Sequence, residues 1–159
     1  ATDTVTTRGL IKPVQSVGVS PLGNTALFFH DTDNGDIDLE SAFFDQNALT
    51  LIELETFFPN PIRLQSEPIA YANAADGETG YFIMEGQSYL GVLDYATIDH
   101  DVLTLPSEPV HLGVLPDTDV AFVNQVHPLG RLSFVDPDAG QRAGLQTITG
   151  FELNSEIER

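Results

Sequence analysis

One tripeptide recurs at a fixed place within a longer pattern. Ser-Glu-Pro begins at Ser66 and again at Ser107, 41 residues later. Each copy precedes a short run of small and apolar residues, a turn rich in Asp, Gly and Thr, and a second apolar run. The segment from Lys12 follows the same plan, so a proline opens each unit: Pro13, Pro68 and Pro109. Such a repeat indicates a supersecondary element that packs against its own copies.

Each unit continues with two further apolar runs. The third runs span residues 48–56, 88–97 and 130–140, and the fourth runs span 61–65, 101–106 and 145–153. All are short, rich in Val, Ile, Leu, Phe and Thr, and separated by Pro, Gly, Asp and Asn, which is the composition of strands and turns. An up-and-down barrel also has evenly spaced strands, but it does not need a motif that recurs every four strands. The pattern therefore predicts an all-β fold of about three four-stranded antiparallel β-propeller blades.

The motif resembles the YVTN-type propeller repeat, a relative of the WD40 and NHL repeats. The similarity lies in the opening proline, in the turns at residues 20–24, 74–79 and 115–119, and in an acid that closes the third run. That acid is Asp94 or Asp136 in the later units and Glu55 in the first. Over residues 13 to about 153 the chain looks like the last three blades of such a protein. The resemblance implies a fold and says almost nothing about activity.

The repeat divides the chain into four parts. Residues 1–12 are expected to be an outer strand of a preceding blade or a closing strand. Residues 13–65 are predicted to form a blade with an acidic insertion at 31–47, residues 66–106 a second blade, and residues 107–159 a third blade with a C-terminal strand. Because closed propellers typically have about 4–8 blades, three blades form an incomplete propeller. We expect it to be completed by missing blades or by a second copy of the chain.

Composition narrows the possible partners. The 24 acids and 6 bases give a formal charge of −18, which repels nucleic acid and anionic lipid because both are bound by clustered Lys and Arg. No apolar run approaches the ~20 residues that cross a bilayer, so direct membrane insertion is not expected. The acidic balance suits a saline environment. The absence of Cys excludes disulfides, thiolate catalysis and cysteine-ligated zinc.

The insertion contains the densest acidic stretch, HDTDNGDIDLE. Closely alternating carboxylates of this kind can supply the six to eight oxygens that Ca²⁺ prefers. The pattern departs from the standard calcium loop, because Gly35 replaces the third Asp and Ala42 stands at the twelfth position. A calcium site and a solvated acidic loop both remain open. The calcium ligands would be Asp31, Asp33, Asp36, Asp38 and Glu40.

Other polar and aromatic residues are expected on the same loop face. His30 ends a second strand, and Glu85 and His127 occupy the corresponding places in the next two blades. These three side chains are expected to approach one another around a channel mouth. Phe43 and Phe44 in the insertion either pack back on the blade or form a contact patch for a partner.

These features favour a non-enzymatic binding or scaffold module. The hypothesis is an extracytoplasmic propeller part, either secreted, periplasmic or at the cell surface, whose loop face contacts a protein partner. No catalytic residue and no cofactor other than calcium is predicted. The alternative is a metal-assisted hydrolase of the lactonase-like propeller type with its site in the central channel. Only Glu85, Asn73 and Asn124 are comparable with the inner-strand ligands of such enzymes.

Overall fold

The computed structural model describes residues 5, 7–137 and 144–150, which form three four-stranded antiparallel sheets. Blade 1 consists of β1 (Ser16–Val19), β2 (Thr25–His30), β3 (Ala48–Glu53) and β4 (Phe58–Arg63). Blade 2 consists of β5 (Pro68–Asn73), β6 (Thr79–Met84), β7 (Tyr89–Asp94) and β8 (Asp99–Thr104). Blade 3 consists of β9 (Pro109–Val114), β10 (Ala121–Gln125), β11 (Arg131–Val135) and β12 (Leu145–Thr149).

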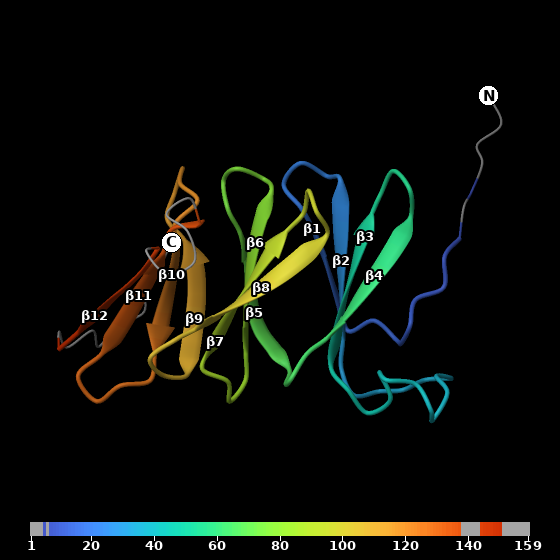
Figure 1. Cartoon of the computed structure of the whole chain (residues 1–159), viewed down its shortest axis with the longest axis horizontal. Helices are drawn as coiled ribbons and strands as arrows, with labels where there is room; N and C mark the ends of the chain where they lie inside the picture. Colours follow the sequence, from blue (N-terminus) through green and yellow to red (C-terminus); the bar gives the residue numbers. More distant parts are fainter. Residues whose placement is uncertain (1–4, 6, 138–143, 151–159) are drawn as a thin grey trace.

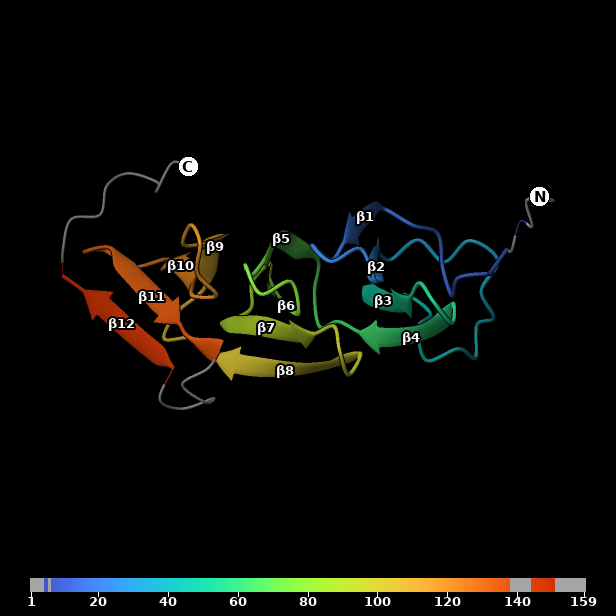
Figure 2. The same cartoon turned by 90° about the horizontal axis from the view of Figure 1, so that it is seen from above.

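The blades stand side by side in an unclosed row, and the predicted fold class is confirmed (Figure 1). Strand order within each sheet follows the chain, so every connection inside a blade is a hairpin. From above, the first strands β1, β5 and β9 lie along one side of the row, and the last strands lie along the other (Figure 2). The described residues include no helix that is long and apolar enough to cross a membrane.

Two apolar layers join the blades. Leu27, Phe29 and Leu51 of blade 1 meet Phe82 and Met84 of blade 2 in the first layer. Side chains alternate between the two faces of a strand, so the other face of blade 2 supplies the second layer, which it shares with blade 3. Full burial of one large aliphatic side chain contributes roughly 1.5–3 kcal/mol. These two layers therefore hold the row together.

The repeated Ser-Glu-Pro fixes each blade to the one before it. Glu67 accepts a hydrogen bond from Gln15 Nε2 of blade 1 at 3.1 Å, and Glu108 accepts one from the backbone N–H of Gly86 in blade 2 at 3.2 Å. The proline begins the first strand of its blade, and the residue after it is skipped in the pairing with the second strand. The skipped residue is a β-bulge. The motif thus has a structural role in both copies.

The end face of blade 1, the face that points away from blade 2, is not open. Ala26, Ala48, Thr50 and Ile52 alternate with the residues of the first apolar layer, yet all four are buried. The N-terminal segment and the insertion both lie on this side of the blade (Figures 1 and 2). They cover a face that a neighbouring blade would otherwise bury.

Lys12 fastens this cover. Its ammonium donates to the backbone carbonyls of Asp31 at 2.8 Å and Gln46 at 2.7 Å, which are the two ends of the insertion. Residues 7–12 accordingly cross the blade without joining a sheet. Residues 7–12 form no strand here, because Lys12 holds the segment to the insertion, and the strand predicted over residues 1–12 for a preceding or closing blade stays a prediction. Residues 1–4 and 6 lie outside the described residues.

Candidate functional site

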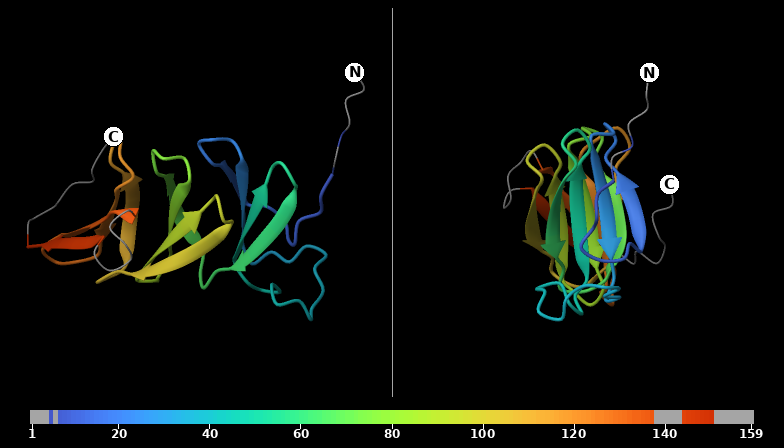
Figure 3. Two further views of the ribbon diagram at one scale, coloured as in Figure 1. Left: turned by 45° about the horizontal axis from the view of Figure 1, so that its top comes forward. Right: turned by 90° about the vertical axis from the view of Figure 1, so that its right-hand side faces the viewer.

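The connections between blades and the loops between second and third strands all lie at one end of the molecule, here called the loop end. The insertion at 31–47 extends beyond the sheets at this end (Figures 1 and 3). It follows His30, the last residue of β2, and precedes Ala48, the first residue of β3. The segments predicted to form a recognition face therefore share one end of the row.

Three acids of the insertion accept hydrogen bonds from backbone N–H groups of the same loop. Asp31 Oδ1 accepts from the N–H of Asp33 at 2.7 Å, and Asp33 Oδ1 accepts from the N–H of Gly35 at 3.0 Å. Asp38 Oδ1 accepts from the N–H of Glu40 at 3.0 Å in the same way. Across the described chain, no three His, Asp or Glu residues are grouped so as to hold a metal ion. The calcium site and the solvated acidic loop both stay predictions for this segment.

The rest of the insertion is a series of tight turns. Backbone hydrogen bonds from Ile37 to Asn34, from Ser41 to Asp38 and from Phe44 to Ser41 each close one turn. Asn34 also pairs with Asp45 across the base of the loop, at 2.5 and 2.7 Å. Phe43 and Phe44 are half-buried. The two rings are thus neither buried in the core nor fully exposed to solvent.

His30 is fully buried, with 0% of its surface exposed. Its Nδ1 lies 2.8 Å from the carbonyl of Pro13, and its Nε2 lies 2.9 Å from Thr50 Oγ1. Both ring nitrogens therefore have a partner inside the protein. This corrects the predicted place of His30 on an exposed binding face, because the side chain turns into the end face of blade 1. Burial and the nearby Lys12 ammonium lower the pKa of His30.

Blade 3 repeats this arrangement with a different residue. Gln125 ends β10 as His30 ends β2, and its Nε2 donates to Ser133 Oγ at 2.6 Å. Ser133 and Thr50 occupy matching places on the third strands. A polar residue at the end of the second strand therefore links the blade internally. The repeat alignment matches His30 with His127, so the correspondence between His30 and Gln125 emerges only from the strand pairing.

Glu85 and His127 lie in the loops after β6 and β10, as predicted. Glu85 is exposed, and its carbonyl accepts from Ser66 Oγ at 2.6 Å. His127 is half-buried, and its Nδ1 accepts from the N–H of Leu129 at 3.2 Å. With His30 turned inward, the three side chains form no common site. Each has instead its own local role.

The residues considered for a hydrolase also lie apart. Asn73 ends β5, whereas Glu85 pairs through its backbone with Glu67, which precedes the start of β5. Asn73 and Glu85 thus lie at opposite ends of blade 2. Asn124 lies on the end face of blade 3, and its Oδ1 is buried without a hydrogen-bond partner among the described residues.

Exposed aliphatic side chains occur at the loop end of all three blades. Each is between 40% and 56% exposed. One lies just before β1, two lie in the bulges of β5 and β9, and two lie in the loop after β10. They are Val14, Ile69, Val110, Val126 and Leu129. Glu67, Glu85 and Glu108 are exposed at the same end. We call this set of five aliphatic residues the loop-end patch. These apolar side chains, with exposed carboxylates at the same end, make the loop end the candidate contact surface of the described residues.

A slot of about 150 Å³ opens beside this patch, between blades 1 and 2. The rings of Phe29 and Tyr71 wall it, with centroids 5.9 Å apart and planes tilted by 60°. The slot is lined by Ser16, Phe29, Pro68, Ile69, Ala70 and Tyr71. It is thus assembled from β1 and β2 of blade 1 and from β5 of blade 2, including the bulge of β5.

The hydroxyl of Tyr71 points away from the slot into a polar cluster. It lies 2.7 Å from Tyr95 Oη, and both hydroxyls contact Asn73 Oδ1. Burial raises the pKa of Tyr71 and of Tyr95. The cluster holds the Tyr71 ring in place. The hydroxyl end of the Tyr71 side chain is therefore restrained by hydrogen bonds.

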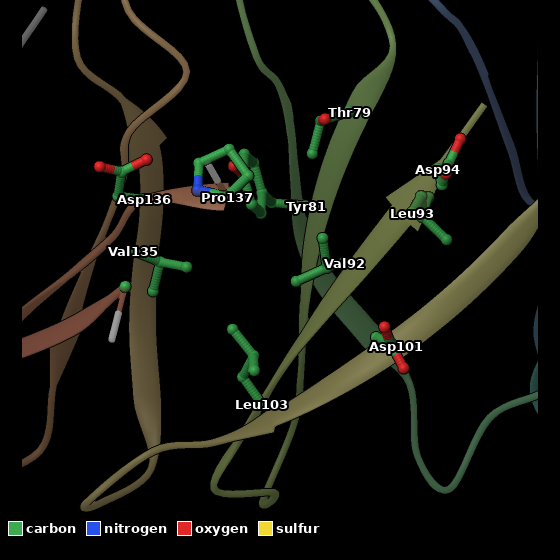
Figure 4. A pocket seen from close by; sticks show the side chains of 11 residues that line it. Thr79, Tyr81, Val92, Leu93, Asp94, Asp101, Leu103, Val135, Asp136 and Pro137 are labelled. Carbon is green, nitrogen blue, oxygen red and sulfur yellow. The ribbon is translucent and has the colours of Figure 1, made fainter. Parts of the chain in front are cut away.

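A larger cavity of about 230 Å³ separates blades 2 and 3. Figure 4 shows Val92, Leu103 and Val135 lining it, with Asp101 and Asp136 at its margins. A third carboxylate, Asp94, caps its own turn by accepting from two backbone N–H groups at 2.8 and 3.0 Å. Asp101 and Asp136 also have interaction partners within the chain. The sequence did not predict this cavity.

No family model matches the sequence, and no curated protein matches it. Solved propeller-type structures do match the fold. Hydrazine synthase from Kuenenia stuttgartiensis has a TM-score of 0.56 and 15% identity, over 92% of this chain and 39% of that one. TolB from Acinetobacter baumannii has a TM-score of 0.49 and 14% identity, over 88% and 34%. A putative 6-phosphogluconolactonase from Bacteroides uniformis has a TM-score of 0.48 and 14% identity, over 82% and 38%.

A structural match at 15% sequence identity supports the assignment of the fold class and nothing further. The chain is an all-β protein of three propeller blades that do not close into a ring. It spans 39% or less of the length of each of these solved chains. The YVTN-type resemblance within this class stays a resemblance.

Proposed function

We propose that the chain is a non-enzymatic binding module, part of an extracytoplasmic propeller that contacts a basic protein partner through its loop end. The observation that carries the proposal is the loop-end patch with its surrounding carboxylates. In this proposal, missing blades or a second copy of the chain extend the row from blade 3, because the end face of blade 1 is already covered. The extracytoplasmic location rests on the sequence resemblance.

The chemistry at the loop end favours contact over catalysis. Apolar side chains stabilise a complex when their surface is removed from water. The surrounding carboxylates favour Lys and Arg on the partner and raise the association rate. By contrast, Glu85, Asn73 and Asn124 do not converge on one point. A hydrolase site would need its ligands from elsewhere.

The test uses two short synthetic peptides, one of Leu and Lys residues and one of Leu and Glu residues. Fluorescence anisotropy measures their binding to the purified chain. The Lys peptide is expected to bind and the Glu peptide is not. The double variant Val126→Asp/Leu129→Asp is expected to weaken binding about tenfold, because buried apolar contacts dominate interface energetics. The added carboxylates would strengthen a purely electrostatic contact, so a loss isolates the apolar contribution.

Leu22→Asp is the matched control. Leu22 is 61% exposed in the turn between β1 and β2, at the opposite end of the molecule. This variant adds the same kind of charge and should leave the affinity unchanged. Equal binding by the double variant and the wild type would contradict the proposal. One tightly held transition-metal ion per purified chain would favour the hydrolase instead.

A further inference from the structure

The outer strands of the three blades differ in how their free edges are protected. β4, β8 and β12 each stand at the end of the strand order of their sheet, so each pairs with a neighbour on one side only. In an antiparallel pair, alternate residues direct both backbone groups toward the neighbour, and the residues between them direct theirs outward. An outward row of N–H and C=O groups can pair with a further strand unless it is blocked.

Proline blocks the edge of β4. The N–H of Leu64 donates to the carbonyl of Asn47 at 2.9 Å, in the same register that pairs β3 with β4. The positions of β4 that direct their backbone groups outward are therefore 59, 61 and 63. The first two are Pro59 and Pro61, which have no N–H to donate. A further strand thus finds most of its donors missing on β4.

Carboxylates block the edge of β8. The N–H of Leu105 donates to the carbonyl of Ser88 at 2.9 Å, so the outward positions of β8 are 100, 102 and 104. Asp99 Oδ1 already accepts from the outward N–H of His100 at 2.8 Å. Asp99 and Asp101 are both exposed on this strand. Charged side chains on an edge strand disfavour pairing with another strand, above all with one from an acidic chain.

The edge of β12 has neither kind of protection. The N–H of Asp136 donates to the carbonyl of Gly144 at 3.0 Å, so the outward positions are Leu145, Thr147 and Thr149. The strand reads LQTIT, without proline and without charge, and its last four residues are exposed. Thr and Ile also favour the extended conformation. Of the three outer edges, β12 is therefore the one that is open to pairing.

We propose that β12 is a dimerisation edge, at which two copies of the chain pair antiparallel and join two blades into one continuous sheet. This inference goes beyond the proposed function, which concerns the loop end, and does not depend on it.

The outward positions of β12 are self-complementary. They are symmetric about Thr147, so a two-fold axis at this residue pairs Thr147 of one copy with Thr147 of the other. The same axis pairs Leu145 with Thr149 in both directions, and every outward N–H meets an outward C=O. Ile148 of one copy then lies opposite Gln146 of the other, as a cross-strand neighbour.

A second copy fits this edge because of what the rest of the chain offers. β4 and β8 are blocked, so the outer edge that a second copy brings is again β12. Contact between two identical surfaces is isologous and closes after two chains. Each chain has a formal charge of −18, but β12 itself has none, so the pairing strands bring no like charges together.

The experiment removes one outward donor. Thr147→Pro deletes an N–H that points away from β11, and β4 already carries prolines at two positions of this kind. The matched control is Val102→Pro, at an outward position of β8. Sedimentation equilibrium over a concentration series gives the dimer dissociation constant, in about 1 M NaCl to screen the net charge. Melting curves check that both variants fold.

Thr147→Pro should raise the dissociation constant about tenfold or more, because the two-fold axis makes one substitution remove two hydrogen bonds. Val102→Pro should leave it unchanged. The Thr147 hydroxyl lies 2.7 Å from Ser133 Oγ, so Thr147→Val controls for the loss of that contact. It keeps the N–H and should still dimerise.

Amide hydrogen exchange identifies the paired edge directly. The N–H groups of Thr147 and Thr149 should exchange more slowly as the protein concentration rises, whereas the N–H of Val102 should not change. Dimers that form without this protection would overturn edge pairing. A chain that stays monomeric at every concentration would overturn it as well. Protection that appears only when the Leu and Lys peptide is added would assign the edge to a different protein and contradict a second copy.

Discussion

At the scale of single residues, the buried His30 links two parts of blade 1. His30 connects the third strand, through Thr50, to the N-terminal segment, through Pro13. Gln125 shows that an amide can take the place of the imidazole in the link to the third strand. His30 differs from Gln125 in one respect, because an imidazole can gain a proton. The end of blade 1 is therefore coupled to pH, whereas the same place in blade 3 is not.

The sign of this coupling follows from the lowered pKa of His30. The unfolded chain has the ordinary pKa of 6.5, and the folded chain has a lower one. Between the two values the unfolded state binds more protons, so stability falls as pH is lowered through 6.5 and then levels off below the folded pKa. Thermal melting from pH 8 to pH 5 should show this loss in wild type. His30→Gln should flatten that part of the profile.

His127→Gln is the control, because His127 is half-buried and bonded only locally through Nδ1. It should keep the wild-type profile. His30→Ala should lose roughly 1–3 kcal/mol at pH 8, since it leaves the Thr50 hydroxyl and the Pro13 carbonyl without their partner. An unchanged slope in His30→Gln would show that another group carries the pH dependence.

At the scale of strands and loops, the repeat made the blades predictable. Proline, bulge and turn residues recur, and they specify local structure in each unit. The orientation of His30 was not predictable in this way, because the cover that buries it comes from Pro13 and the insertion. The slot could not be predicted from the sequence for the same reason. Its walls, Phe29 and Tyr71, are distant in sequence, and only the packing of one blade on the next brings them together.

The acidic insertion gives a prediction at this scale. Its carboxylates are used in turns, and those of Asp31 and Asp33 accept backbone hydrogen bonds at 2.7 and 3.0 Å. Low millimolar Ca²⁺ and Mg²⁺ should therefore raise the melting temperature by equal, small amounts relative to EDTA. Asp31→Asn/Asp33→Asn should respond as wild type does. A calcium-selective rise that this double variant loses would instead establish the sequence-predicted site, because ligand binding stabilises the folded state by mass action.

At the scale of the whole molecule, the two end faces differ. Blade 1 is covered by its own chain, so a neighbouring blade cannot pack there without displacing the cover. On blade 3, Ile148 is exposed and the buried Asn124 Oδ1 has no hydrogen-bond partner among the described residues. Buried polar groups without partners are uncommon. We therefore expect further blades or a second copy to dock on blade 3.

If chains associate only through the end face of blade 3, two copies form a dimer, and no larger ring or fibre can grow. Light scattering over a concentration series should show monomer converting to dimer, with nothing larger. Ile148→Lys should shift this equilibrium toward monomer. Val102→Lys, on the outer strand of blade 2, should not, although Val102 has a similar exposure of 49% against 42% for Ile148. Species that keep growing with concentration would show that both end faces couple.

The position of Lys12 has a practical consequence for chemical labelling. It is the only lysine in the sequence, the residue is 5% exposed, and its ammonium is bound to two carbonyls. An amine-reactive dye can reach this side chain only when the N-terminal segment lifts from the insertion. The rate of its modification thus measures how often the cover opens. The chain carries a built-in reporter of local unfolding at one defined place.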